Sequence, residues 1–192
     1  MTDNRETVNK LLQEAGSKIA SLVKATVDFY NQIKWKTVII EIPEVPEPSH
    51  RPRLSGYRVY VPGAARHQRF FNKHVLPKLG GLFISTPCRI ELDVYCKCPK
   101  SFNRTQTILA EMGLLRPWGN TGDIDNFSKT MLDQIQPNEK RGHVGIMEND
   151  CLIDELHVRK LYSVNPRSVM RITYMDSIPV EIMKLLKLDK CV

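Results

Sequence analysis

The stretch GDIDNFSK, residues 122–129, places two aspartates, Asp123 and Asp125, one residue apart. Like charges this close repel each other, so a fold that holds them together must supply a compensating cation. Mg²⁺ is the usual choice, because hard ions take carboxylate oxygens as ligands. Lys129 follows Asp125 by four residues and Asp133 follows Lys129 by four, so a helix starting near Asp125 would project all three from neighbouring positions on one face. This spacing predicts a metal site with an ammonium group beside it.

The order of these residues resembles the signature of the RusA-like Holliday junction resolvases, small metal-dependent endonucleases of bacteria and their phages. That signature is a basic or Pro-rich lead-in, Asp-x-Asp-Asn, a lysine four residues on, an aspartate four further on and a later acidic pair. The lead-in here is residues 116–122, and the core consists of Asp123, Asp125, Asn126, Lys129 and Asp133. The later pair is Asn149-Asp150, in which Asn149 departs from the aspartate that most members carry. The similarity extends over about residues 37–174.

The resemblance implies an α+β fold with a single mixed β-sheet flanked by helices, to which this chain adds an N-terminal helix. It also implies a homodimer that binds four-way DNA junctions and cuts two opposed strands in DNA recombination and repair. Mg²⁺ would be the cofactor, with Mn²⁺ able to substitute. We expect a helical extension over residues 1–35, a nuclease domain over 36–176 and a helical tail over 177–192.

Phosphodiester hydrolysis gives each acidic or basic residue of the motif a role. Asp123, Asp125 and Asp150 are the expected metal ligands, and Lys129 would sit against the scissile phosphate or the attacking water. Asp133 fits three roles: a ligand, an acceptor that orients Lys129, or a surface acid of the helix. Asn126, which follows Asp125 directly, is expected in a supporting position around the ion. Both one-ion and two-ion sites fit. An aspartate that only caps the following helix is the simplest alternative for Asp123, but it leaves the rest of the motif unexplained.

Basic residues are concentrated in the middle of the chain. Residues 51–104 hold eleven Arg or Lys and only two acids, Glu91 and Asp93, within a chain of net charge +7. Such an excess is typical of a protein that binds a polyanion such as DNA, although it also serves solubility. The candidates for phosphate contacts are Arg51, Arg53, Arg66, Arg69, Lys73, Lys97, Lys100 and Arg104.

The cysteines and the hydropathy bear on the compartment. The number of cysteines is odd, at five, and no signal peptide is evident, which favours a reducing cytoplasm, here that of a bacterium or a phage-infected bacterium. No zinc site is expected from Cys96 and Cys98, because no second Cys or His pair lies at a suitable spacing. No run of residues approaches the roughly 20 apolar positions of a membrane span.

Hydrophobic periodicity predicts the order of the elements. One helix is expected over residues 3–34, because Val8, Ile19, Phe29 and Ile33 belong to a series spaced alternately by four and three. That series suits either a dimerising or partner-binding helix or a helix docked on its own domain. Strands are expected over residues 36–42, 57–61, 88–96, 152–164 and 169–175, and helices over 64–76, 102–114, 125–135 and 179–188. Residues 137–145 are polar and are expected to form an exposed, mobile loop that holds His143.

Two other classes of function stay open at this point. One is a branched-DNA-binding protein without catalysis, whose metal site has degenerated and of which Asn149 would be a sign. The other is a metal-binding interaction module whose N-terminal helix recruits a partner protein.

Overall fold

The computed structural model describes residues 5–45, 53–55, 58–60, 64–118, 121–139 and 142–185. Its centre is a four-stranded sheet in the order β1-β6-β4-β5. The strands are β1 (Trp35–Ile42), β4 (Cys88–Lys97), β5 (Ile153–Ser163) and β6 (Arg167–Met175). β6 runs antiparallel to β1 and β4, whereas β4 and β5 are parallel, so the sheet is mixed. A separate pair is formed by β2 (Arg53–Ser55) and β3 (Arg58–Tyr60).

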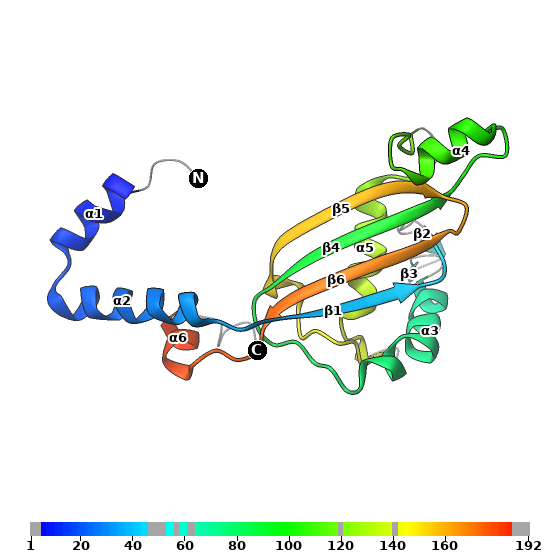
Figure 1. Ribbon diagram of the computed structural model, residues 1–192. Helices are drawn as coiled ribbons and strands as arrows, with labels where there is room; N and C mark the ends of the chain where they lie inside the picture. Colours follow the sequence, from blue (N-terminus) through cyan, green and yellow to red (C-terminus); the bar gives the residue numbers. More distant parts are fainter. Residues whose placement is uncertain are drawn as a thin grey trace.

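Helices cover one face of this sheet. α5 (Ile124–Ile135) crosses behind the strands in Figure 1, and α3 (Ala64–His74) contacts α5 beside it. α4 (Arg104–Glu111) follows β4, and the chain then returns through α5 to the parallel strand β5. A parallel pair needs such a long crossover, because its two strands must enter the sheet from the same end. The expected α+β fold with one mixed sheet and an added N-terminal helical segment is confirmed.

Alternation along the strands decides what is buried. The side chains of Ile90, Leu92 and Val94 in β4 are at most 1% exposed and point toward α5, which contributes Phe127 and Met131 to the same core. Fully burying one such side chain stabilises the fold by about 2 kcal/mol. The buried face of β4 therefore matches the face expected from the two-residue alternation of the sequence. The helix over residues 124–135 likewise matches the expectation from the 3.6-residue periodicity.

The opposite face of the sheet is held by a charged clamp. The Asp93 side chain on β4 is 2% exposed and accepts hydrogen bonds from Arg159 Nε and Nη2 on β5, at 2.6 and 2.8 Å. Arg171 Nη1 on β6 donates to the same carboxylate at 3.0 Å. One aspartate thus joins three neighbouring strands through charge-assisted bonds.

The N-terminal region differs from the expected single helix. The chain forms α1 (Arg5–Glu14) and α2 (Ser17–Gln32), because Gly16 adopts an extended conformation at the N-cap of α2 and interrupts the helix. Phe29 and Ile33 pack against Met175, Ile178 and Ile182 next to α6 (Val180–Leu185). The alternative in which the N-terminal helix docks on its own domain therefore holds for the end of α2.

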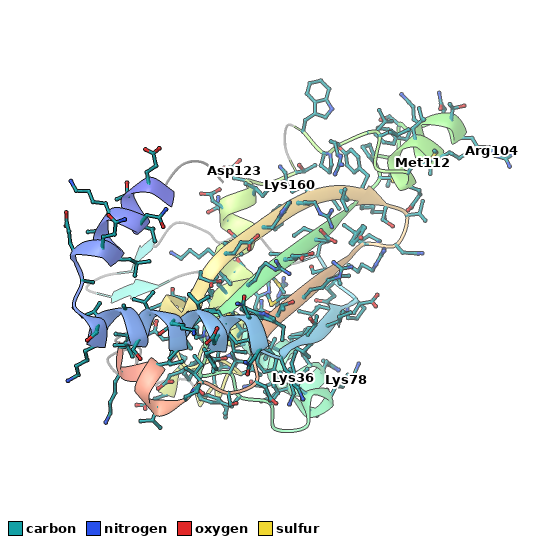
Figure 2. All side chains as sticks on the ribbon, turned by 60° about the vertical axis from the view of Figure 1, so that its left-hand side comes forward. Lys36, Lys78, Arg104, Met112, Asp123 and Lys160 are labelled. Carbon is teal, nitrogen blue, oxygen red and sulfur yellow. The ribbon has the colours of Figure 1, made fainter. Side chains whose placement is uncertain are left out.

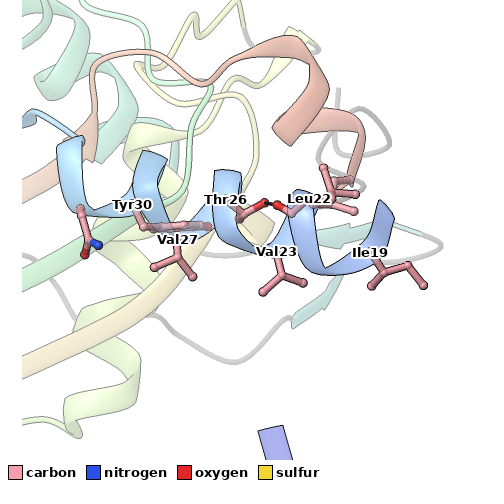
Figure 3. Close-up of a pocket in the computed structure, with 8 residues that line it drawn as sticks. Ile19, Leu22, Val23, Thr26, Val27 and Tyr30 are labelled. Carbon is pink, nitrogen blue, oxygen red and sulfur yellow. Dashed lines mark hydrogen bonds between the residues drawn. The ribbon is translucent and has the colours of Figure 1, made fainter. Parts of the chain in front are cut away.

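The rest of α2 leaves apolar side chains in solvent. Ile19, Val23 and Val27 are 56%, 37% and 51% exposed and line a groove along the helix (Figure 3). Whether this face binds another protein stays a prediction. No helix among the residues that the structure describes has the length and hydropathy to cross a membrane.

The loop after α5 is more buried than its polar sequence predicts. His143 is 2% exposed, and its ring nitrogens face the Asn72 side-chain oxygen and the Gln134 carbonyl. The Ile146 and Met147 N–H groups both donate to the carbonyl of Ile135 at the end of α5, at 2.7 and 3.0 Å. The expectation of an exposed loop is therefore wrong at His143, whose ring nitrogens have partners on α3 and α5, and it holds at Glu139, Gly142 and Val144.

Gly145 is required at that turn. Its φ is +69°, and a Cβ there would lie 2.6 Å from the backbone of Gln136 and Pro137. Gly145→Ala should therefore destabilise the protein by about 3 kcal/mol, through overpacking added to left-handed strain. The matched control is Gly142→Ala, where φ is +62° and nothing lies within 4 Å, so that a loss of only about 1 kcal/mol is expected. Urea unfolding of both variants measures this difference, and equal losses would contradict the account.

The Asp93 clamp predicts a pH dependence of stability. Burial acts to raise the pKa of Asp93, but the hydrogen bonds from Arg159 and Arg171 outweigh it and hold the pKa below its ordinary value of 3.8. A carboxylate whose pKa is lower in the folded state contributes stability above its unfolded pKa, and that contribution is lost as the pH falls through the folded value. Asp93→Asn should cost about 2 kcal/mol at pH 7.

The loss should shrink as the pH falls below about 4, because Asp93 then binds a proton in the unfolded chain while it is still ionised in the folded one, and the contribution of the clamp is gone once the pH has passed the folded pKa. Glu91→Gln, on the same face of β4, is the matched control and should show a much smaller effect. Urea unfolding at pH 7 and at pH 3 provides the measurement. A loss for Asp93→Asn that stays constant across this range would argue against the clamp.

Candidate functional site

The first turn of α5 carries the acidic motif. Gly122, at φ +87°, turns the chain into the helix, and Asp123 is the N-cap with an extended backbone. The Asp123 carbonyl accepts the first helical bond, from the Phe127 N–H at 3.2 Å, but its side chain makes no capping hydrogen bond. The simple cap interpretation of this aspartate is therefore not supported by its geometry.

Asp125 lies in the same first turn, and Lys129 follows one turn later. Asp123, Asp125 and Lys129 are all exposed, while Phe127 between them is buried and fixes the helix on the sheet. The positive end of the helix dipole favours carboxylates here. Two exposed carboxylates beside an N-terminus fit a hard, oxygen-preferring cation such as Mg²⁺.

Asn126 and Asp133 accompany this group along α5. Asn126 is half-buried, and Asp133 is exposed two turns after Asp125, on the same helix as Lys129. Neither position excludes the supporting roles that the sequence predicts for them, which stay predictions.

The loop before α5 is anchored at one point and exposed at the next. Pro117 is buried, whereas the Trp118 side chain is 84% exposed. This tryptophan stands five residues before Asp123, so the approach to the acidic motif carries a large aromatic surface in solvent.

Lys160 on β5 was not predicted as a site residue. Its Nζ donates to the Gly122 carbonyl at 2.7 Å and to the Thr121 hydroxyl oxygen at 3.4 Å. Figure 2 shows Asp123 and Lys160 close together where α5 begins, beside β5. The signal in the sequence was the alternation of β5, which places a charged residue on the same side as Val158 and Tyr162, the side that packs on the helices.

Asp150 lies at the other end of β5. It begins a short 3₁₀ turn, Asp150–Leu152, which leads directly into the strand, and it is exposed. The seven residue steps from Ile153 to Lys160 span about 23 Å of strand. Because Lys160 contacts the residue before Asp123, Asp150 is remote from Asp123 and Asp125 within one chain.

The expectation that three aspartates gather within one chain is therefore not met. Among the described residues, no group of three or more His, Cys, Asp or Glu side chains is arranged to hold a metal ion. The physical reason is that α5 runs back along the sheet and delivers the chain to the far end of β5, as the bonds from Ile146 and Met147 to Ile135 show. One chain thus offers two carboxylates at one end and Asp150 at the other.

Asn149 has a structural role where the resemblance leads one to expect aspartate. Its side-chain oxygen accepts a hydrogen bond from the Cys151 N–H at 3.0 Å, so it caps the turn that presents Asp150. Aspartate and asparagine cap such turns about equally well. The departure at this position is therefore compatible with the local structure.

The basic candidates fall into two described groups. Arg66, Arg69 and Lys73 are exposed on α3, where Arg69 Nε also donates to the Ala65 carbonyl at 3.2 Å. Lys97, Lys100 and Arg104 are exposed between the end of β4 and the start of α4. Arg51 lies outside the described residues, and of Arg53 only the backbone, in β2, is described. Their contact with DNA stays a prediction.

The hydrogen bond by which Asn149 caps the turn predicts a small loss of stability that depends on the residue substituted there. Asn149→Ala should destabilise the protein by about 1 kcal/mol, because the Cys151 N–H loses its acceptor. Asn149→Asp keeps an acceptor oxygen and should stay within about 0.5 kcal/mol of wild type. Thermal unfolding of the two variants in parallel measures the difference. A loss of the same size in both would show that the side-chain oxygen does not cap this turn.

Comparison with known proteins gives one match. A family model described as "Endodeoxyribonuclease RusA" matches residues 43–173, more than half of the chain. The matched span includes β4, α5 and β5, and with them Asp123, Asp125, Lys129, Asp150 and Lys160. No curated protein matches the chain.

Proposed function

Since the chain belongs to the RusA endodeoxyribonuclease family, we propose that it is a Mg²⁺-dependent nuclease that resolves Holliday junctions or related branched DNA. Its role would lie in DNA recombination and repair, and the two cuts would be paired. The observation that carries the proposal is the pair of exposed carboxylates, Asp123 and Asp125, with Lys129 on the first turns of a helix whose other face is buried. A divalent ion at these oxygens would lower the pKa of bound water and polarise the scissile phosphate.

The side chains of α5 supply the rest of the expected chemistry. Asp123 and Asp125 would hold the ion. Because both belong to the first turn of one helix, their carboxylates stay close together in the folded chain. Lys129 would place its ammonium group against the phosphate oxygens, where positive charge counts most as the transition state gains negative charge. The exposed arginines and lysines would contact the DNA backbone, which fixes the substrate without reading its sequence.

A homodimer would account for the position of Asp150. In the described part of the chain, β5 pairs with β4 alone, so its outer edge is open to another strand. Two copies of β5 paired antiparallel would lie start to end, which brings Asp150 of one copy toward the end of the sheet where Lys160 holds Gly122 of the other.

Charges along β5 suit such pairing. With His157 at the two-fold axis, Glu155 would face Arg159 of the second copy, and Leu156 would face Val158. Leu156 is 43% exposed in the single chain and would gain cover. Opposite charges across antiparallel strands and apolar pairs both favour such an arrangement. Two cuts on opposed strands also need two sites related by a two-fold axis.

The proposal predicts that Asp125→Asn and Asp150→Asn each reduce cleavage of a synthetic four-way junction by at least about 100-fold in Mg²⁺ while junction binding persists. Glu139→Gln, which removes one exposed charge after α5, is the matched control and should cut at the wild-type rate. Tight binding by wild type without cleavage in any divalent metal would instead support the non-catalytic branched-DNA-binding protein.

Mixing the two inactive variants decides whether sites are shared between copies. If Asp150 completes the site of its partner, a heterodimer of Asp125→Asn with Asp150→Asn retains one intact site and nicks one strand. If each chain holds its own complete site, every dimer in the mixture is inactive. Nicked product from the mixture, separated from paired cuts on a native gel, is the expected result, and its absence would overturn the shared site.

A further inference from the structure

Lys160 occupies an unusual place for a lysine. It is half-buried on the face of β5 that packs on the helices, in line with Val158 and Tyr162. Lysine is rarely placed inward unless its ammonium group has partners. Its two acceptors here, the Gly122 carbonyl at 2.7 Å and the Thr121 hydroxyl at 3.4 Å, are uncharged oxygens of the loop before α5. The contact therefore ties this loop to the sheet.

The loop conformation bears directly on Asp123. Gly122 is held at φ +87°, which few other residues adopt, and the peptide whose carbonyl Lys160 binds is the one that joins Gly122 to Asp123. Asp123 has the extended backbone of a normal N-cap residue, at φ −82° and ψ 145°, yet its side chain makes no capping bond. An aspartate in that position usually turns its carboxylate onto the N–H of the second or third helical residue.

We infer that Lys160 is a positioning residue for the ion site, because it fixes the Gly122–Asp123 peptide and so keeps the Asp123 carboxylate turned out from α5. The inference rests on the proposed function, since the ion is the one that Asp123 and Asp125 would hold. Lys160 itself reaches a carbonyl and a hydroxyl, so it acts on the ion only through the loop. Groups that orient a metal ligand in this way typically change metal affinity by about 10- to 100-fold when they are removed.

Measuring metal affinity distinguishes a positioning role of Lys160 from a contact that only stabilises the fold. Lys160→Met keeps the length and apolar stem of the side chain but removes its donors, and Lys160→Arg keeps donors in a different geometry. Lys78→Met, an exposed lysine on the 3₁₀ helix Leu76–Leu79, is the matched control for the change in charge. All variants are made in the full chain, and their thermal unfolding is measured without metal.

Free Mn²⁺ measured by electron paramagnetic resonance gives the affinity of each protein. Lys160→Met should bind Mn²⁺ about 10- to 100-fold more weakly than wild type, Lys160→Arg should recover part of that loss, and Lys78→Met should bind within about two-fold. Junction cleavage by Lys160→Met should recover as Mg²⁺ is raised, because the defect lies in ion binding. Wild-type Mn²⁺ affinity in a folded Lys160→Met protein would overturn the inference and leave the proposed function intact.

A second measurement tests the positioning role of Lys160 in the metal-free protein. If wild type itself binds no Mn²⁺ at millimolar concentration, the proposed function fails. A crystal structure of metal-free Lys160→Met then tests the positioning role alone. We expect the Asp123 carboxylate to accept hydrogen bonds from the N–H of Asp125 or Asn126, as an ordinary cap does. An Asp123 side chain that stays as it is in the wild-type chain would overturn the inference.

Discussion

Burial of one face of α5 against the sheet is the interaction on which the arrangement of the functional residues depends. Phe127, Met131 and Ile135 are each at most 1% exposed and lie beneath the sheet with Ile90 and Leu92. Because these side chains recur every four residues, they lie on one face of α5 and leave positions on the opposite face in solvent. Asp125 and Lys129 occupy those positions, so the packing that stabilises the fold also presents the acidic motif.

The same packing fixes the direction in which α5 runs. That direction keeps Asp150 apart from Asp123 and Asp125. α5 begins beside Lys160 near the end of β5 and ends where Ile135 receives the N–H groups of Ile146 and Met147. The chain then enters β5 from that far end, and Asp150 stands at the entrance. A single chain therefore cannot bring Asp150 to Asp123 without undoing the parallel pairing of β4 and β5. A second copy paired with β5, which has β4 as its one partner among the described strands, would remove this difficulty without any change in the fold.

Periodicity made much of this structure predictable. The alternation of apolar and polar residues from Cys88 to Cys96 predicted β4 and its buried face. The pattern around Asp125 predicted a helix whose two ends lie within one residue of those of α5. The break at Gly16 was missed, because the heptad spacing continues across it while the backbone does not. The burial of His143 was missed for another reason: its partners Asn72 and Gln134 are polar groups that only the tertiary fold brings to it.

The candidate site was predictable in part for the same reasons. Asp123, Asp125 and Lys129 are local in sequence, and a helix places them together whatever the remaining chain does. The place of Asp150 depends on the order and direction of strands, which no local pattern contains. Lys160 could be recognised as a charged residue in an inward position of β5, but the closer of its two acceptors is a backbone carbonyl, which leaves no trace in the sequence.

The most direct test of the central claim is anomalous diffraction from crystals of the protein soaked in Mn²⁺. The account predicts a peak at the start of α5 with carboxylate oxygens of both Asp123 and Asp125 at about 2.1 Å, the distance typical of small hard cations. It also predicts that the third carboxylate at that peak is Asp150 of a second copy. Full occupancy of Mn²⁺ elsewhere in the molecule, with the Asp123 and Asp125 carboxylates empty, would contradict it.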